Sequence, residues 1–467
     1  MAAFGGGPPG RGGQKPSLRK AMAVFEHRNY RLLWISSTFS FTGMQMQQVA
    51  RALLAWELTE SFAWLGWIAL SFGLPMLMFA LIGGAIADRM EKRNLTLMTQ
   101  TATAVLALLT GALIVADQIT IELLFAIGLV QGTFFAFGMP ARMPLMAEVV
   151  GREQVMSAIA LSNAAMNATR LFGPAIAGLL VGWWGVESAY LVQGILYVFS
   201  SAILLFIPTG LGKVENGGFA RPAQGNMFVE IGRGLRYVAT DPPLRLLIIM
   251  MFASTLFGMP YILLLAGFVQ RDLGQGAEAF GYLQAISGVG ALVASLAIAT
   301  LTEYDRKPLV QWVAGVLSGL GLVLLAVGSS MAGFPGAIVA TVVLGLTLTA
   351  YQTLNNTMVM DEARPEYYGR VMSINMLTFS AMPLMAAPLG ILADVIGAYE
   401  LFTLMGVVLV AVMVAVAVLS PRYTFSRRNG PDWRAADAAA SAPPHGPMGG
   451  GAGREGAGTP AAAPEQR

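Results

Sequence analysis

Three polar residues interrupt an apolar stretch in the second quarter of the chain, and their spacing places them together. Asn163, Asn167 and Arg170 follow one another at i, i+4 and i+7, which lines them along one face of a helix. A charge facing lipid at the bilayer centre costs at least about 2.5–3.5 kcal/mol, so we expect this face to look into a polar or watered interior. The stripe could hold an anionic group of a ligand, or it could brace neighbouring helices through hydrogen bonds.

Gly173, Pro174 and Gly178 follow directly after this stripe. A proline inside a helix removes one backbone hydrogen bond and permits a kink, while a glycine lets another helix approach closely. We therefore expect a helix kink here. A kink that serves packing alone would explain the same residues.

The elements that position these residues are predicted to be membrane-spanning helices. Hydrophobic residues make up 55% of the 467 residues and charged residues only 12%, against about 25% in an ordinary soluble domain. Segments of about 20 apolar residues, long enough to cross a bilayer, recur along the chain, and lipid forces such segments to be helical. We expect twelve spans, at 31–55, 61–86, 94–116, 119–140, 154–181, 187–208, 244–270, 278–301, 308–329, 333–359, 368–395 and 399–421.

Composition also restricts the chemistry that the chain could perform. It contains no cysteine and only two histidines, His27 and His445, so thiolate chemistry is excluded and a histidine-based metal or acid–base site is not expected. No glycine-rich phosphate-binding loop is present, which disfavours an ATP-driven pump. We therefore expect neither an enzyme nor a bound cofactor or metal.

The distribution of basic residues predicts the orientation. Arg51 and Arg170 fall within predicted spans, and Arg271 is the only basic residue in a loop reached by odd-numbered helices. The other Lys and Arg residues lie on the opposite side, and the positive-inside rule places that side, with both termini, in the cytoplasm. We expect a protein of the bacterial inner (plasma) membrane that does not bind nucleic acid.

The chain divides into two halves and two tails. Residues 1–22 and 423–467 are rich in Gly, Ala and Pro, and we expect them to be disordered cytoplasmic tails. Six spans fall in 23–208 and six in 243–422. The cytoplasmic linker 209–242 between them contains a predicted amphipathic helix, either lying on the membrane surface or serving as a plain connector.

The end of the second predicted span carries a recognisable motif, "GGAIADRMEKR". Gly83 and Gly84 would allow close helix approach, as small residues do in lipid. Asp88 could cap the next helix and pair with Arg89 or Arg93, contacts that a moving gate could make and break. A basic loop that only sets topology is the alternative.

This motif resembles the loop between helices 2 and 3 in the major facilitator superfamily. "NYRLLWIS", "PARMPLMAEVVGREQVMSAIALSNAAMNATRLFGPAIAGLL" and "YYGRVMS" are similar to the enterobactin-exporter-like branch of secretion-effector permeases, and the resemblance covers about residues 25–420. It implies an all-α membrane protein of twelve transmembrane helices in two pseudo-symmetric six-helix bundles, which rock about a cavity lined by helices 1, 4, 7 and 10. "GPAIAG" resembles the helix 5 motif of exporters in the superfamily.

Polar residues on the predicted helices are candidates for the substrate cavity, although each amide could instead link two helices. Arg51 approximately continues a stripe of Thr38, Thr42, Gln45 and Gln48, and it could also extend to the outer surface. The candidate cavity residues are Gln45, Gln48, Arg51, Gln131, Asn163, Asn167, Arg170, Tyr351, Gln352, Asn355 and Asn375.

The sequence thus predicts a secondary active transporter, an exporter of small amphipathic molecules such as a drug, a siderophore or a lipid-like metabolite, acting as a monomer in the lipid bilayer. A non-transporting sensor or assembly scaffold with the same fold is the alternative. Proton or other ion coupling would require a titratable group, and an acid that related permeases often carry in helix 1 is absent. Glu122, Glu148 and Asp394, near the predicted membrane edges, are the remaining candidates for a proton relay.

Overall fold

The computed structural model describes residues 22–151, 154–210, 232, 236–300, 306–364 and 367–421, apart from some side chains in α3, α11 and α14. The described part is helical throughout. A short η1 (Ala23–Glu26) precedes the long helices. The helices of the first half are α2 (Arg28–Thr59), α3 (Phe62–Arg89), α4 (Lys92–Val115), α5 (Ile121–Val150), α6 (Val155–Trp184) and α7 (Val186–Leu205). Those of the second half are α9 (Pro242–Ala253), α10 (Tyr261–Gly267), α11 (Ala277–Thr300), α12 (Lys307–Ala332), α13 (Phe334–Glu362), α14 (Tyr368–Ile396) and α15 (Ala398–Leu419).

Ten helical segments of the described chain are long and apolar enough to cross a membrane. They coincide with ten of the predicted spans. The other two predicted spans correspond to α2 and α14, which are helical but are not among the ten. In α2 the polar residues lower the hydropathy. In α14 the side chains are described without a gap only over Ala381–Ile396, which is an apolar helix of shorter length.

Helix α5 extends ten residues beyond the predicted end of its span. Pro140 and Pro144 both lie inside it, and the helix ends only at Val150, before Gly151 with its φ of +75°. Proline removes one hydrogen bond but is tolerated in membrane helices, because neighbouring groups can satisfy the freed carbonyl. The extension places Arg142 within a helix, where the sequence reasoning had counted it among the basic residues at the cytoplasmic side.

The predicted span 244–270 is one continuous apolar segment with two breaks in its α-helical pattern. The π-helical turns η2 (Ser254–Gly258) and η3 (Phe268–Asp272) separate α9 from α10 and end the segment. Such turns are uncommon inside helices and are often found at functional sites.

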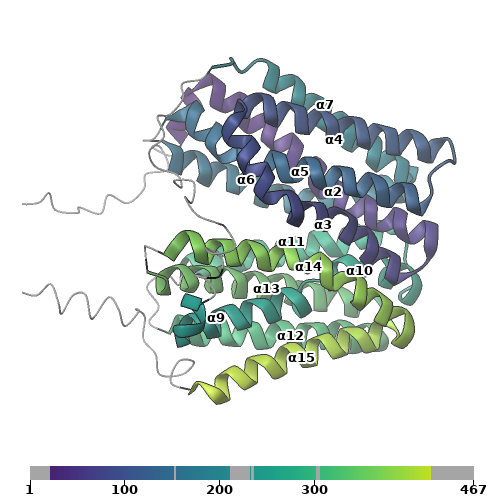
Figure 1. Cartoon of the computed structure of the whole chain (residues 1–467). Helices are drawn as coiled ribbons and strands as arrows, with labels where there is room; N and C mark the ends of the chain where they lie inside the picture. The colour runs from purple at the N-terminus through teal and green to yellow at the C-terminus, as the bar shows by residue number, and fades with distance from the viewer. Residues whose placement is uncertain are drawn as a thin grey trace, which may run out of the picture. The chain divides into compact units, whose positions relative to one another are not determined.

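The helices of the two halves of the chain, α2–α7 and α9–α15, are called here the first and the second set. The most extensive contacts between the sets join α3 to α14 and α6 to α11 (Figure 1). Glycines bring these backbones together: a Cβ added to Gly66 would lie 2.3 Å from the Ala386 carbonyl oxygen, and one added to Gly178 would lie 2.5 Å from Gly281 Cα. Both crossings therefore depend on the absence of a side chain.

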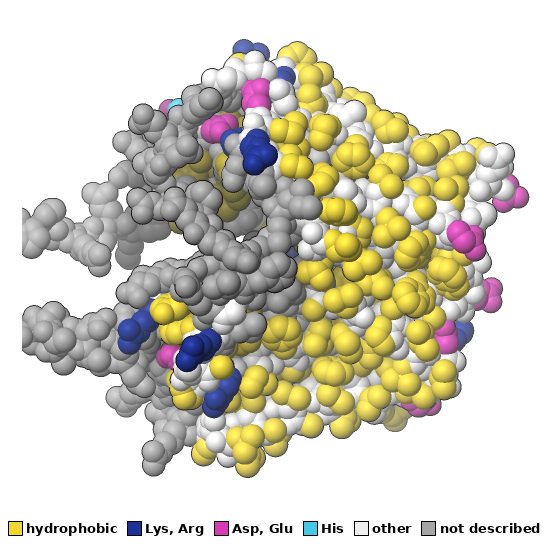
Figure 2. All heavy atoms as spheres, in the orientation of Figure 1, with side chains coloured by type: hydrophobic (Ala, Val, Ile, Leu, Met, Phe, Trp, Pro, Cys, Tyr) yellow, Lys and Arg dark blue, Asp and Glu magenta, His cyan; other side chains and the backbone are white. Residues whose placement is uncertain are grey.

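Large hydrophobic side chains cover the outward faces of the helices. Phe172, Trp183 and Val395 are 59%, 66% and 77% exposed, far more than large apolar side chains in a water-soluble core. Figure 2 shows hydrophobic side chains across the middle of the visible face, with charged side chains gathered toward its two ends. This surface suits contact with lipid.

The described end of the linker packs against protein. Val238 is buried in a cluster with Leu244, Met358 and other apolar residues of the second half. The Tyr237 ring stacks on Tyr367 at 4.0 Å, and its hydroxyl accepts a hydrogen bond from the Arg364 amide. Burial raises the pKa of Tyr237 above its usual value. This portion therefore packs on the second half of the chain. Phe228, Ile231, Arg233 and Leu235 of the predicted amphipathic helix lie outside the described residues.

Candidate functional site

The polar stripe of Asn163, Asn167 and Arg170 lies in the middle of α6, and all three residues are exposed. Arg170 makes no ion pair or side-chain hydrogen bond with the described part of the chain. A guanidinium at this depth without a protein partner needs water or an anion around it, because its charge is costly in hydrocarbon.

The direction of this stripe follows from the rest of α6. Steps of four, three, seven and four residues connect Asn163, Asn167, Arg170, Ala177 and Val181, which keeps all five on one strip about 80° wide. Ala177 and Val181 are only 0% and 6% exposed and belong to the main core cluster, which includes residues of α2, α10 and α11. The polar stripe therefore points the same way as this buried end of the helix.

The lipid-type surface of α6 lies on its opposite side. Phe172, Ile176 and Trp183 are 59%, 41% and 66% exposed, and each is turned by about 180–220° from Asn163 along the helix. The exposed polar residues are thus separated from the apolar surface. The strip that carries them is buried at the C-terminal end of α6, at Ala177 and Val181. It is exposed from Arg170 toward the N-terminal end.

Arg51 forms a polar cluster with α5 inside the first set of helices. Its Nη2 donates to Gln131 Oε1 at 2.8 Å, and the same oxygen accepts from Gln47 Nε2. The guanidinium also lies 4.8 Å from the centre of the Phe72 ring, a cation–π contact. Gln131 is 3% exposed, so this predicted cavity residue here links α5 to α2.

Arg142 forms a second cationic contact that sequence reasoning missed. Its Nη2 donates to Ser40 Oγ at 2.9 Å, and its guanidinium lies 4.7 Å from the centre of the Phe41 ring on α2. Because the span was predicted to end at Pro140, Arg142 was not considered as an intramembrane residue. The two prolines of α5 are typical of a helix end, and for that reason the predicted span stopped before Arg142.

The other predicted residues of α2 do not join the Arg51 cluster. Gln48 is exposed, and Gln45 is half-buried with its Cβ beneath Gly173 of α6. The hydroxyls of Thr38 and Thr42 donate to carbonyls one turn back in α2. Gln47, one residue away from the predicted stripe, is the amide that shares Gln131 with Arg51.

Of the three predicted residues of α13, Tyr351 and Asn355 lie together and Gln352 points elsewhere. Asn355 is 1% exposed and accepts from Gln311 Nε2 of α12 at 2.6 Å, with the Tyr351 hydroxyl 3.4 Å from the same oxygen. Asn355 and Gln311 therefore link two helices of the second set. Gln352 instead donates to Met259 Sδ at 3.1 Å, beside the η2 turn. The side chain of Asn375 lies outside the described residues.

The predicted gating motif is described in part. Asp88 falls within α3, which continues to Arg89, so it does not occupy the N-cap of α4, where Glu91 stands. Arg93 donates to the Leu204 and Leu205 carbonyl oxygens at 3.2 and 3.0 Å and so caps the end of α7. Arg89 is exposed, and Gly83 packs on the α5 backbone. The side chain of Asp88 and the surroundings of Gly84 lie outside what the structure describes.

Helix α6 continues without interruption through Gly173 and Pro174. Gly173 lies directly against Gln45 of α2, and Gly178 lies directly against Gly281 of α11. These residues therefore mark the places where two other helices approach α6.

Three carboxylates were candidates for a proton relay. Glu122 is exposed at the start of α5, and Glu148 lies 4.0 Å from Lys92 Nζ in an ion pair. Asp394 binds the first turn of α3. Each lies toward a helix end, away from the polar stripe of α6.

Comparison with known proteins gives consistent matches over most of the chain. Residues 19–447 match the model of a family described as transmembrane secretion effectors. The staphyloferrin A transporter of Staphylococcus aureus is 22% identical, covering 80% of this chain and 91% of that protein. The multidrug efflux pump Tap of Mycolicibacterium fortuitum is 25% identical, covering 76% and 86%.

Solved structures show the same fold. An inward-facing, unoccupied bacterial homologue of the lysosomal transporter Spinster has a TM-score of 0.65 at 14% identity, covering 90% of this chain and all of that one. An inward-facing bacterial homologue of ferroportin has a TM-score of 0.64, also at 14% identity, covering 85% and 99%.

Proposed function

The chain belongs to the transmembrane secretion effector family of the major facilitator superfamily, and from this premise we propose that it is a secondary active exporter of small amphipathic molecules that carry an anionic group. It is an integral membrane protein and not an enzyme. Relatives include a siderophore transporter and a multidrug efflux pump, so a siderophore, a drug or a lipid-like metabolite is the proposed substrate class.

The observation that carries this proposal is the α6 stripe. Arg170 is exposed on this strip of α6 and has no ion pair or side-chain hydrogen bond with the described residues, and Asn163 and Asn167 add amide groups beside it. A guanidinium offers a planar set of donors that matches a carboxylate, and two amides can satisfy neutral polar groups.

The proposed mechanism is alternating access between two bundles of six membrane-spanning helices, α2–α7 and α9–α15. The strip of α6 is covered at its C-terminal end and uncovered toward its N-terminal end, as expected for a cavity open on one side. We assign the uncovered side to the cytoplasm, with both termini, because the basic residues concentrate there. The end at which α2 joins α3, called here the outer end, then faces away from the cytoplasm.

The remaining features of the proposal are a monomer in the bilayer of the bacterial inner membrane, no cofactor and no nucleic-acid partner. Energy would come from a proton or another ion. The carboxylates at the helix ends are the proposed groups for such coupling, since the α6 stripe itself carries none.

Transport by the purified protein in lipid vesicles tests the proposal. The vesicles would contain a pH-sensitive dye, and a carboxylate siderophore, a catecholate siderophore and a cationic dye would be offered in turn. We expect flux of an anionic compound above that of empty vesicles, with a simultaneous change of internal pH if protons are exchanged. No flux of any compound would favour the scaffold, and flux of the cationic dye alone would remove the role given to Arg170.

A further inference from the structure

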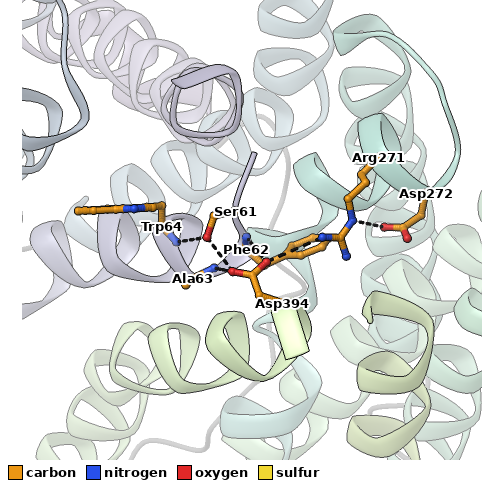
Figure 3. Close-up of polar contacts among 7 residues, drawn as sticks. All are labelled: Ser61, Phe62, Ala63, Trp64, Arg271, Asp272 and Asp394. Carbon is orange, nitrogen blue, oxygen red and sulfur yellow. Dashed lines mark hydrogen bonds and ion pairs between the residues drawn. The ribbon is translucent and has the colours of Figure 1, made fainter. Parts of the chain in front are cut away.

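An acidic residue of the second set of helices caps a helix of the first set. Asp394, near the end of α14, accepts hydrogen bonds from the backbone amides of Phe62 and Ala63 at 2.9 Å each, and from the Ser61 hydroxyl at 2.7 Å (Figure 3). A helix is usually capped by a residue next to its own first turn. Here the cap comes from more than 330 residues away along the chain.

The local cap of α3 is weak by comparison. The Trp64 amide donates a long hydrogen bond to Ser61 Oγ at 3.5 Å, and the Ser61 hydroxyl itself donates to Asp394. A carboxylate at a helix N-terminus is favoured by the helix dipole, and hydrogen bonds to a charged group are about twice as strong as neutral ones. The first turn of α3 is therefore satisfied mainly by Asp394.

Arg271 completes the contact from a third element. Its guanidinium lies 4.3 Å from the centre of the Phe62 ring, and Nη1 lies 3.9 Å from Asp394 Oδ1. It also pairs with Asp272 at 3.7 Å (Figure 3). Because Arg271 is 38% exposed, the ion pair alone contributes little. Its effect is to hold the ring and the carboxylate together.

Close packing continues directly beneath this contact. A Cβ added at Gly390, one turn before Asp394, would lie 2.2 Å from the Phe62 carbonyl oxygen, so α3 and α14 touch through their backbones. A Cβ added at Gly267 would meet the rings of Trp56 and Phe62. Ala266, beside it, is fully buried. The residues next to the Asp394 contact are therefore closely packed.

We propose that Asp394 is a gating residue: its bond to the first turn of α3 latches the outer end of the transporter, and it must leave that turn for the substrate to exit there. This inference rests on the proposed function, because only an alternating-access transporter needs the contact to open. When it opens, the Phe62 and Ala63 amides and the carboxylate exchange their mutual bonds for water.

A single engineered cysteine reports on the latch, because the chain has none of its own. Ala266→Cys places a thiol at a fully buried position, next in sequence to Gly267, which faces the Trp56 and Phe62 rings. Gln275→Cys, in the exposed loop near Arg271, serves as a marker of the outer side. A membrane-impermeant maleimide is added to vesicles on the side from which this marker reacts. The labelling rate at position 266 then measures how often the outer end opens.

Asp394→Asn should accelerate this labelling about tenfold, equivalent to about 1.4 kcal/mol. Asp117→Asn is the matched control, since it removes one exposed carboxylate from the loop between α4 and α5, and it should leave the rate unchanged. An unchanged rate in Asp394→Asn would overturn the inference.

A double variant separates latching from simple helix capping. Ser61→Asp supplies a carboxylate cap from within the α3 segment, so combined with Asp394→Asn it should recover thermal stability while labelling stays fast. Restoration of slow labelling would show that Asp394 only caps α3, and would refute the gating role. Neither readout needs a substrate. Altered labelling together with no flux in the vesicle assay would support the gating role of Asp394 and contradict the transporter proposal. Flux together with unaltered labelling would contradict the gating role alone.

Discussion

Replacing Arg170 distinguishes the two roles that the α6 stripe could have. If Arg170 braced the bundle, Arg170→Met would lose interhelical hydrogen bonds worth about 0.6–2 kcal/mol each. The structure gives it no such bond with the described residues, and a charge that faces lipid at the bilayer centre costs at least about 2.5–3.5 kcal/mol. Since the exposed side chain retains part of its hydration, we expect the variant to be unchanged or more stable by roughly 1 kcal/mol.

Arg51→Met is the matched control within the same set of helices. It removes the bond to Gln131 and the contact with Phe72, so we expect a loss of about 1–3 kcal/mol. The unfolding free energy of both variants is measured in detergent micelles by tryptophan fluorescence, beside flux of the compound found in the vesicle assay. Arg170→Met should lose that flux although it stays folded. A loss of stability as large as that of Arg51→Met, or normal flux, would refute this reasoning.

The remaining predictions use the same unfolding measurement. Gly178→Ala places a Cβ 2.5 Å from Gly281 Cα, which cannot rotate away, so we expect destabilisation of about 1–3 kcal/mol. Gly328→Ala, whose Cβ meets Leu324 at an ordinary 3.4 Å, should be neutral or gain up to about 1 kcal/mol from helix propensity; equal effects in the two variants would contradict the close crossing. Asn355→Leu leaves the buried Gln311 Nε2 without its acceptor and should cost about 1–3 kcal/mol, whereas a neutral result would mean that this amide pair does not link α12 to α13.

Sequence reasoning predicted the all-helical membrane fold, because apolar length alone determines where a chain can cross lipid. It placed helix ends less well where proline and polarity mislead. The span predicted to end at Pro140 continues to Val150, and Asp88, a candidate cap of the next helix, lies within the preceding one.

The residues of the candidate site were partly predictable. Spacing alone placed Asn163, Asn167 and Arg170 on one strip, because helical periodicity is a local property. Spacing could not show that Arg51 shares Gln131 with Gln47, since this depends on how α2 is rotated against α5. The cap that Asp394 provides to α3 was equally hidden, because it joins residues from opposite ends of the chain.

The two π-helical turns between Pro242 and Asp272 change how this membrane segment can vary. A turn closed by an i→i+5 bond holds one residue more than an α-turn, so every side chain after it is rotated by about 100°. Removing one residue from Ser254–Gly258 would rotate the residues that follow and turn Tyr261, now 1% exposed, away from the core. A single-residue insertion or deletion here therefore alters which neighbours α10 meets, while barely altering how far the segment reaches across the bilayer.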